Sequence, residues 1–129
     1  MASGNRVAQL QRELDSFHLE DNGEREQWSS GSVRDTRRGK GRYDLISPLA
    51  LTRLARVMEE GAQKYGDRNW EGGIPMSRFL DSTLRHLCQY LCEDDEEDHL
   101  GQALWNLHCL VHFDSLRLMG ELLPEFDDI

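Results

Sequence analysis

The sequence predicts a single all-α domain, a helical bundle over residues 1–129. Leucines recur at three- and four-residue spacing through the second half of the chain, which is helical periodicity. Serine, proline and glycine stand at positions where helices begin and end. We find no segment that alternates apolar and polar residues over a useful strand length, and no internal repeat. These observations together favour helices over a sheet.

Composition limits the classes of function. The formal net charge of -9 disfavours a duplex nucleic-acid partner, because such binding depends on a basic surface. No apolar run approaches the ~20 residues of a membrane span, and no signal-peptide pattern opens the chain, so a cytoplasmic location without a membrane partner is expected. We interpret Cys88, Cys92 and Cys109 as reduced, small core residues, because they are odd in number and lie in leucine-rich helical sequence.

The first part of the chain predicts one helix followed by a loop. Residues 1–20 are assigned to an N-terminal helix, since apolar residues within 5–19 follow 3-4-3 spacing. Residues 22–47 form a predicted basic loop. Within it, residues 34–42 carry Arg34, Arg37, Arg38, Lys40 and Arg42. A loop of this length is either functional or disordered, and both interpretations remain open.

A helical core is predicted for residues 48–123, before a tail at 124–129. Ser47 and Pro48 are a start signal for the second helix, and Gly66 ends it. Ser77 is expected to cap the third helix. Its apolar side consists of Leu80, Leu84, Leu87 and Leu91.

The fourth helix is predicted to begin within or just after an acidic run. Its apolar seam consists of Leu100, Leu104, Leu107, Val111 and Leu118. Further apolar residues lie off that seam: Trp105, Leu110, Phe113, Leu116 and Met119. Because this is more apolar surface than a small bundle covers, we expect the residues off the seam to form a subunit interface.

Six consecutive acids occupy residues 93–98, within the segment CEDDEEDHLG. A solvated loop or helix start is the simple interpretation. The alternative is a site for Mg²⁺ or Mn²⁺, which prefer oxygen ligands. If the run is helical, acids three or four apart share a face. The candidate metal ligands are Glu93, Asp94, Glu97 and Asp98.

Two other phosphate or metal motifs are not supported. His108 and His112 have the spacing of a zincin pair but lack the glutamate that follows the first histidine, and Cys88 and Cys92 form no CxxC knuckle. A Walker loop requires serine or threonine after its lysine, whereas Gly41 follows Lys40.

Three segments together resemble a known family. They are KGRYDLISP (40–48), GAQKYGDRNWEGG (61–73) and LRHLCQYLCEDDEEDHLGQALWN (84–106). They are similar to the phage dATP/dGTP pyrophosphohydrolases within the MazG-like all-α nucleoside triphosphate pyrophosphohydrolases. The resemblance runs from about Gly31 to about Leu110, and is nearest to MazZ-type members of phages that replace adenine with 2-aminoadenine. Those members usually have a glycine-containing insertion before the His-Leu pair, whereas Asp98 directly precedes His99 here.

The resemblance implies a MazG-like bundle that assembles as a dimer or tetramer, works with Mg²⁺ or Mn²⁺, and resides in the host cytoplasm if phage-encoded. It implies cleavage of a purine (deoxy)nucleoside triphosphate, with dGTP or GTP favoured, to the monophosphate and pyrophosphate. That reaction would supply dGMP for 2-aminoadenine nucleotide synthesis. A non-catalytic helical module that binds nucleotide or protein is the alternative.

Roles for individual residues follow from that chemistry. Glu97, with Glu93, is the catalytic candidate, because a carboxylate outside the metal's ligands can accept the proton of the attacking water. The substrate-binding candidates are Lys64, Arg68 and Arg85 for phosphates, Asn69 and Trp70 for the base, and His86 and Asn106 for orientation. Trp70 as a core residue and His86 as a satisfied buried histidine are the competing interpretations. Glu59 and Glu60 are expected to face solvent.

Overall fold

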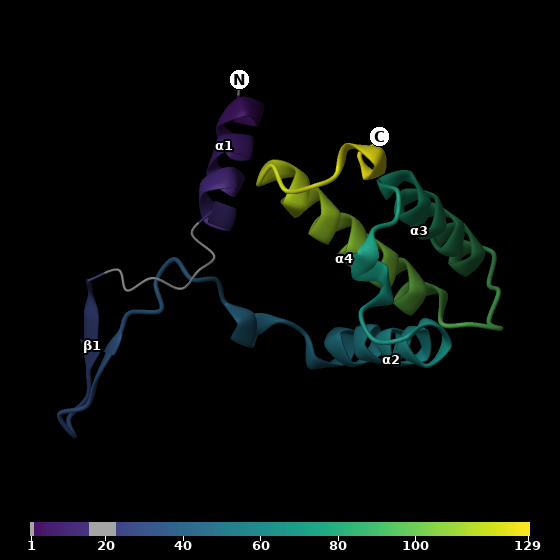
Figure 1. Ribbon diagram of the computed structural model, residues 1–129. Helices are drawn as coiled ribbons and strands as arrows, with labels where there is room; N and C mark the ends of the chain where they lie inside the picture. Colours follow the sequence, from purple (N-terminus) through teal and green to yellow (C-terminus); the bar gives the residue numbers. More distant parts are fainter. Residues whose placement is uncertain (1, 16–22) are drawn as a thin grey trace. The chain divides into compact units, whose positions relative to one another are not determined.

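A computed structural model describes residues 2–15 and 23–129, which belong to two compact units, Met1–Ile46 and Ser47–Ile129 (Figure 1). The predicted all-α class is confirmed: within these residues four α-helices account for most of the structure, and the sheet has two short strands. No described helix has the length and apolar character needed to cross a bilayer.

The N-terminal unit contains a helix and a hairpin. Helix α1 spans Ala2–Asp15, and residues 16–19 of the predicted first helix lie outside the described residues. Strands β1 (Arg25–Gln27) and β2 (Val33–Asp35) pair antiparallel within the segment predicted to be a loop. Strands of three residues are too short to show the alternation by which sequence reveals a strand. A 3₁₀ turn at Tyr43–Leu45 follows.

The second unit begins with α2, which spans Pro48–Tyr65. The Ser47 hydroxyl accepts a hydrogen bond from the amide of Ala50, and Gly66 ends the helix at a positive φ of 95°. Both boundary predictions are therefore confirmed. They succeed because capping depends on local backbone donors and on the freedom of glycine, which neighbouring helices do not alter.

After a 3₁₀ turn at Asn69–Gly72, helix α3 spans Met76–Leu91. The predicted cap by Ser77 is wrong: the helix begins at Met76, after Pro75, two residues earlier than a cap at Ser77 would place it, and Ser77 lies inside the first turn. Its amide and hydroxyl instead donate to the Asp128 carboxylate, which fastens the C-terminal segment to the start of α3.

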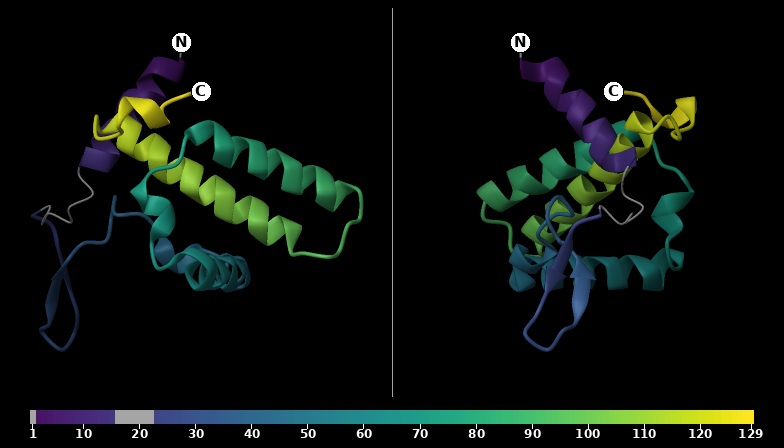
Figure 2. Two further views of the ribbon diagram at one scale, coloured as in Figure 1. Left: turned by 45° about the vertical axis from the view of Figure 1, so that its right-hand side comes forward. Right: turned by 90° about the vertical axis from the view of Figure 1, so that its left-hand side faces the viewer.

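Helix α4 spans His99–Leu118, capped by Asp98, and a 3₁₀ turn at Pro124–Phe126 follows. The start after the acidic run confirms the predicted boundary. Helices α3 and α4 form an antiparallel pair, and α4 lies between α3 and α2 in both views (Figures 1 and 2). The central α4 therefore contributes side chains to two different contacts.

The core of this unit is aromatic and sulfur-rich. Phe79 and Phe113 stack with ring centroids 5.5 Å apart, beside the fully buried Met76 and Cys109. Burial raises the pKa of the Cys109 thiol to about 12, because the thiolate loses its hydration. The core interpretation holds for Cys109 and is wrong for Cys88 and Cys92, which are exposed free thiols.

The apolar faces of α3 and α4 are oriented differently from the prediction. The leucines of the third helix and three seam residues of the fourth are exposed: Leu80, Leu84, Leu87, Leu91, Leu104, Leu107 and Val111. We call these seven residues the leucine face. Conversely, Phe113 is buried and Trp105, Leu110 and Leu116 are partly buried against the core, so these side chains are used within the chain, and the subunit interface predicted for them stays a prediction. A helical wheel shows an apolar arc but not which neighbour covers it.

Candidate functional site

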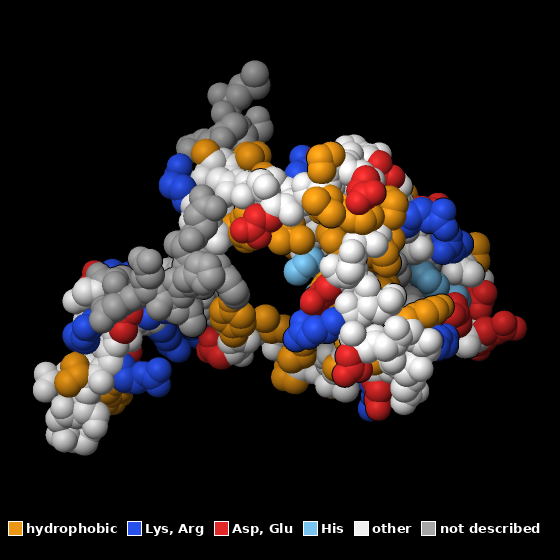
Figure 3. Space-filling model, viewed as in Figure 1, with side chains coloured by type: hydrophobic (Ala, Val, Ile, Leu, Met, Phe, Trp, Pro, Cys, Tyr) orange, Lys and Arg blue, Asp and Glu red, His pale blue; other side chains and the backbone are white. Residues whose placement is uncertain are grey.

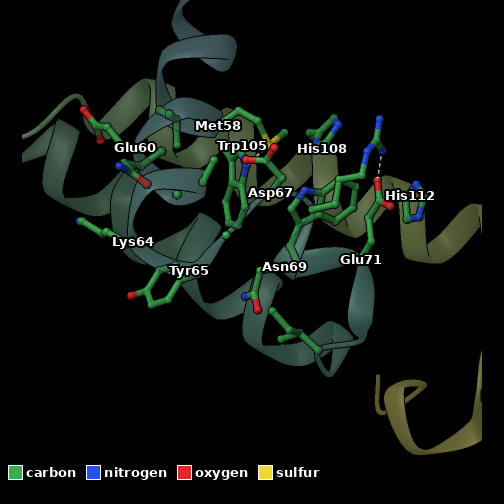
Figure 4. A pocket seen from close by; sticks show the side chains of 18 of the residues that line it. Met58, Glu60, Lys64, Tyr65, Asp67, Asn69, Glu71, Trp105, His108 and His112 are labelled. Carbon is green, nitrogen blue, oxygen red and sulfur yellow. Dashed lines mark hydrogen bonds and ion pairs between the residues drawn. The ribbon is translucent and has the colours of Figure 1, made fainter.

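A cavity of about 1030 Å³ lies within the second unit (Figure 4). It is bounded by the C-terminal half of α2, the glycine-rich turn before α3, and one side of α4. Its polar lining includes Glu60, Lys64, Asp67, Arg68, Asn69, Glu71, Glu97, Gln102, His108 and His112. This volume lies in the range of small-molecule sites, and several charged groups converge on it.

Helix α2 supplies one acid and one base to the cavity. Glu60 and Lys64 stand one turn apart and therefore share a helix face (Figure 4). Lys64 was predicted to bind substrate, whereas Glu60 was expected to face only solvent. Glu60 is exposed, yet it lines the cavity. The signal that could have identified it is its four-residue spacing from Lys64.

The turn between α2 and α3 contributes three predicted residues. Arg68 has a left-handed backbone (φ 58°) and pairs with Glu71 at 2.5 Å. Asn69 lines the cavity beside it. Trp70 also lines the cavity but is only 9% exposed, and its ring meets Phe113 edge-on in the core. Trp70 thus has little free surface for a base to stack on, which favours the core interpretation.

Helix α4 brings residues that the sequence did not single out as substrate ligands. Trp105 lines the cavity, and its indole N–H donates to the Met58 sulfur at 3.4 Å, which ties α4 to α2. His108 and His112 contact the Trp70 ring, with centroids 5.2 and 4.9 Å from it. Burial, and then the neighbouring His112, lower the pKa of His108. A neutral imidazole there can both donate and accept hydrogen bonds.

The acidic run forms a turn rather than a helix. Helix α3 ends at Leu91, and Glu93 has a left-handed φ of 60°. The acidic run therefore lies between α3 and α4 and belongs to neither helix. The prediction that these acids share a helical face is wrong, because the left-handed backbone at Glu93 turns the chain away from the helical path. Figure 3 shows acidic side chains gathered on one end of the molecule, and all six are exposed.

Two of the candidate metal ligands have partners of their own. Both oxygens of Asp98 pair with Arg53 of α2, and Oδ1 also accepts from the Gly101 amide at 3.0 Å. The Arg53 pair, and then the Gly101 hydrogen bond, hold the pKa of Asp98 below its usual range. Asp94 accepts from the Glu96 amide at 3.0 Å, and this hydrogen bond and the nearby His99 lower the pKa of Asp94. Only Glu97 of the four predicted ligands lines the cavity.

The side chains that could hold a metal ion differ from the four predicted acids. Within residues 2–15 and 23–129, the one group of three whose donor atoms all lie within 4.8 Å of one another consists of His86, Glu97 and His99. The carboxylates of Glu93, Asp94 and Asp98 do not join it. The predicted acid-only set therefore does not converge in this geometry, whereas Glu97 fits a site that includes two imidazoles.

The remaining substrate-binding candidates lie elsewhere. Arg85 pairs with Asp81 at 2.7 Å on the exposed surface of α3 and does not line the cavity. Asn106 is buried, and its side-chain amide donates to the Gln102 carbonyl one turn earlier. His86 is partly buried, and its Nδ1 faces Nδ1 of His99 at 3.0 Å. The structure brings Lys64, Arg68, Asn69, Trp70 and Glu97 together and leaves Arg85, His86 and Asn106 outside the cavity.

Comparison with known proteins gives consistent matches. A dATP/dGTP diphosphohydrolase of Salmonella phage PMBT28 is 38% identical over 74 residues, which are 57% of this chain and 23% of the relative. The matching segment thus spans under a quarter of that protein. No solved structure matches. The profile of the family described as "dATP/dGTP diphosphohydrolase, N-terminal" matches residues 30–119, most of the chain and the whole of the cavity, so this protein belongs to that family.

Proposed function

We propose that the protein hydrolyses a purine (deoxy)nucleoside triphosphate between its α and β phosphates, releasing the monophosphate and pyrophosphate. The preferred substrate is dGTP or GTP, and the dGMP formed supplies 2-aminoadenine nucleotide synthesis in a phage, as in MazZ-type members. The main support is the cavity, which is lined by Glu60, Lys64, Arg68 and Glu97. All four residues lie within the segment that matches the family profile. The name of the Salmonella phage relative supports a purine deoxynucleotide as substrate.

Two cations of the cavity suit a triphosphate, and its four carboxylates, Glu60, Asp67, Glu71 and Glu97, call for a divalent cation between them and the phosphates. Such a substrate carries about four negative charges, and catalysis depends mainly on neutralising and positioning them. Lys64 and Arg68 supply two cations from the α2 side and the adjoining turn. Arg68 is 78% exposed at its side chain, so it can exchange Glu71 for a phosphate at little cost in desolvation.

Glu97 is the proposed general base. It is exposed, lines the cavity and belongs to no salt bridge with a lysine or arginine among the described residues, so its carboxylate is available to accept a proton from water. A divalent cation, Mg²⁺ or Mn²⁺, when bound, supplies further neutralisation of the phosphates and acidifies a bound water. The other carboxylates that line the cavity, Glu60, Asp67 and Glu71, can offer it oxygen ligands and leave Glu97 free to act on water.

The purine is assigned to the α4 side of the cavity. Trp105, His108 and His112 lie there, opposite Glu60, Lys64 and Tyr65 (Figure 4). Imidazoles and the Gln102 amide are groups that hydrogen-bond to base edges, and Trp105 is an aromatic surface with a fixed N–H. In Figure 4, Lys64 lies across the cavity from this base site, whereas Glu71, the ion-pair partner of Arg68, lies beside His112.

The reaction can be tested by incubating the protein with dGTP and Mn²⁺ and separating the products by ion-exchange chromatography. We expect dGMP and pyrophosphate in equal amounts. Appearance of dGDP and phosphate would contradict the proposed bond cleavage. Binding of dGTP without turnover, indifferent to chelator, would support the non-catalytic module instead.

A second test addresses Glu97 directly. Glu97→Gln removes the proton acceptor and should lower kcat at least about 100-fold, because general-base catalysis contributes on that scale. Glu96→Gln is a matched control, since its side chain belongs to the same exposed run and does not line the cavity. Equal activity of the two variants would remove Glu97 from the mechanism.

We also propose that the chain forms a homo-oligomer, a dimer or tetramer, through the leucine face. Leu84, Leu91 and Val111 are 55%, 77% and 57% exposed on adjacent antiparallel helices. Each chain has a net charge of -9, so two copies repel each other at most surfaces. The leucine face is made of apolar residues, so two copies can meet there with little charge repulsion. Light scattering after size exclusion should give a multiple of 14.9 kDa for the wild type and a smaller mass for Leu84→Glu. A wild-type monomer at high concentration would contradict this assembly.

A further inference from the structure

We propose that His86, Glu97 and His99 form a binding site for a divalent transition-metal ion with two imidazole nitrogens and one carboxylate as ligands. His86 lies near the end of α3, His99 is the first residue of α4, and Glu97 lies in the turn between them. Because the two helices pack antiparallel along their length, the histidines are held by regular structure on both sides of the turn.

The distances fit one shared ion. His86 Nδ1 and His99 Nδ1 face each other at 3.0 Å, and Glu97 Oε2 lies 3.7 Å from His99 Nδ1. Two nitrogens bound at right angles, each about 2.1 Å from one metal, are about 3.0 Å apart. When both Nδ1 atoms are unprotonated, with each ring's proton on Nε2, the two nitrogens and the Glu97 carboxylate present lone pairs to one another. An ion satisfies all three groups at once.

The burial of His99 supplies a second, independent observation. Its residue is 3% exposed, and Nε2 is a buried nitrogen without a hydrogen-bond partner among the described residues. Asp94 Oδ1 approaches it to 3.2 Å, without the alignment of a hydrogen bond. A metal on Nδ1 fixes the proton on Nε2, and a carboxylate beside that N–H is the usual outer partner of a metal-bound histidine. Asp94 thus orients His99 rather than binding the ion itself.

The donor set selects the class of metal. Imidazole ligands suit Co²⁺, Ni²⁺ and Zn²⁺, and Mn²⁺ more weakly, whereas Mg²⁺ prefers oxygen ligands. The site therefore discriminates against Mg²⁺. Glu97 belongs to this group through Oε2 and also lines the cavity, so the ion would stand at the cavity's edge and Oε1 would remain the oxygen that can accept a proton. The inference rests on the geometry of these side chains and does not require the proposed hydrolase activity.

Cobalt(II) is a suitable probe, because its visible absorption changes when nitrogen ligands replace water. We would strip the full-length protein with chelator, then titrate it with CoCl₂ and, separately, MgCl₂, following absorbance and heat. We expect one Co²⁺ per chain, with a dissociation constant at least about 100-fold below that of Mg²⁺. Equal affinity for the two ions, or no Co²⁺ absorption band, would overturn the proposal.

Variants test which residues bind. His86→Ala should abolish the Co²⁺ band, and Asp94→Asn should weaken binding about tenfold by releasing the His99 ring. His112→Ala is the matched control, a partly buried histidine of α4 outside the group. If His86→Ala fails to fold, as judged by circular dichroism, His86→Asn keeps a polar side chain of lower affinity. A Co²⁺ isotherm unchanged in the folded His86 variant means adventitious binding only.

Because this titration contains no nucleotide, it separates the two proposals. A wild-type protein that hydrolyses dGTP but gives no Co²⁺ band would contradict the metal site alone. Normal Co²⁺ binding by a protein that never hydrolyses dGTP would contradict the proposed function alone.

Discussion

Two turns connect the helices of the C-terminal unit, and they are stabilised in different ways. The tryptophan turn, residues 66–75, buries Trp70 in the aromatic core. The acidic turn, residues 92–98, has no buried side chain and is ordered by polar contacts of Asp94 and Asp98. The comparison teaches that apolar burial fixes the wall of the cavity, whereas the end that carries Glu97 depends on charge and hydrogen bonding.

The strongest test of this difference is Trp70→Ala. Loss of a buried indole that contacts Phe113 leaves a cavity in the core and should lower the free energy of unfolding by about 3–5 kcal/mol. Trp28→Ala is the control, since Trp28 is 48% exposed and should change stability by less than about 1 kcal/mol. Urea unfolding measures both. Similar values for the two variants would show that burial does not stabilise the tryptophan turn.

The next largest effect is expected for Gly73→Ala in the same turn. Gly73 has φ 118°, a conformation that side chains disfavour, and an added Cβ would overlap the Phe126 ring. We expect a loss of about 2 kcal/mol in unfolding free energy. Gly72→Ala is the neighbouring control, because its Cβ would meet no atom within 4 Å. Thermal melts of both variants should separate clearly, and coincident melts would contradict the close approach of Phe126.

The acidic turn should respond less, through Gly101→Ala. A Cβ on Gly101 would overlap the Asp98 carboxylate and push it away from the start of α4. Loss of this cap should cost about 1 kcal/mol. Gly61→Ala, also within a helix but with open space at its Cβ, should instead stabilise the protein by about 0.5–1 kcal/mol. The opposite signs make differential scanning calorimetry decisive.

The smallest effect concerns the charge of Asp98. Its pKa is lowered by Arg53, so the pair contributes stability above the unfolded-state pKa and loses it as pH falls through the folded-state value. Both side chains are over 40% exposed, so the contribution at pH 7 is below about 1 kcal/mol. Asp98→Asn keeps a capping side chain, and its deficit relative to wild type should shrink as pH falls below the unfolded-state pKa and vanish once pH is below the folded-state pKa. A deficit that persists at low pH would exclude the ion pair as its cause.

Local signals predicted helix boundaries well, and contacts between helices were the main source of error. The start of α2 at Pro48 and of α4 at His99 follow from nearby serine, proline and aspartate. The exposed leucine face was missed because the side of α3 that is turned inward includes the polar residues Thr83, His86 and Gln89, whereas the more apolar side is exposed. The β1–β2 hairpin was missed because each strand has three residues.

The candidate site was predictable only in part for the same reason. Lys64, Arg68 and Asn69 lie within one short segment, so a sequence motif keeps them together. Gln102, His108 and His112 reach the same cavity from α4 because of how α4 crosses α2, which no local pattern encodes. The acidic run was misjudged because helical spacing was applied to residues that form a turn.

Because two of the three thiols are exposed and one is buried, thiol labelling can measure local opening of the native protein. A maleimide dye should modify exposed Cys88 and Cys92 at once, whereas Cys109 reacts only after Phe113 and its neighbours separate. The rate at which Cys109 is modified therefore reports how often the core opens in the native protein. The measurement needs no denaturant and no added cysteine.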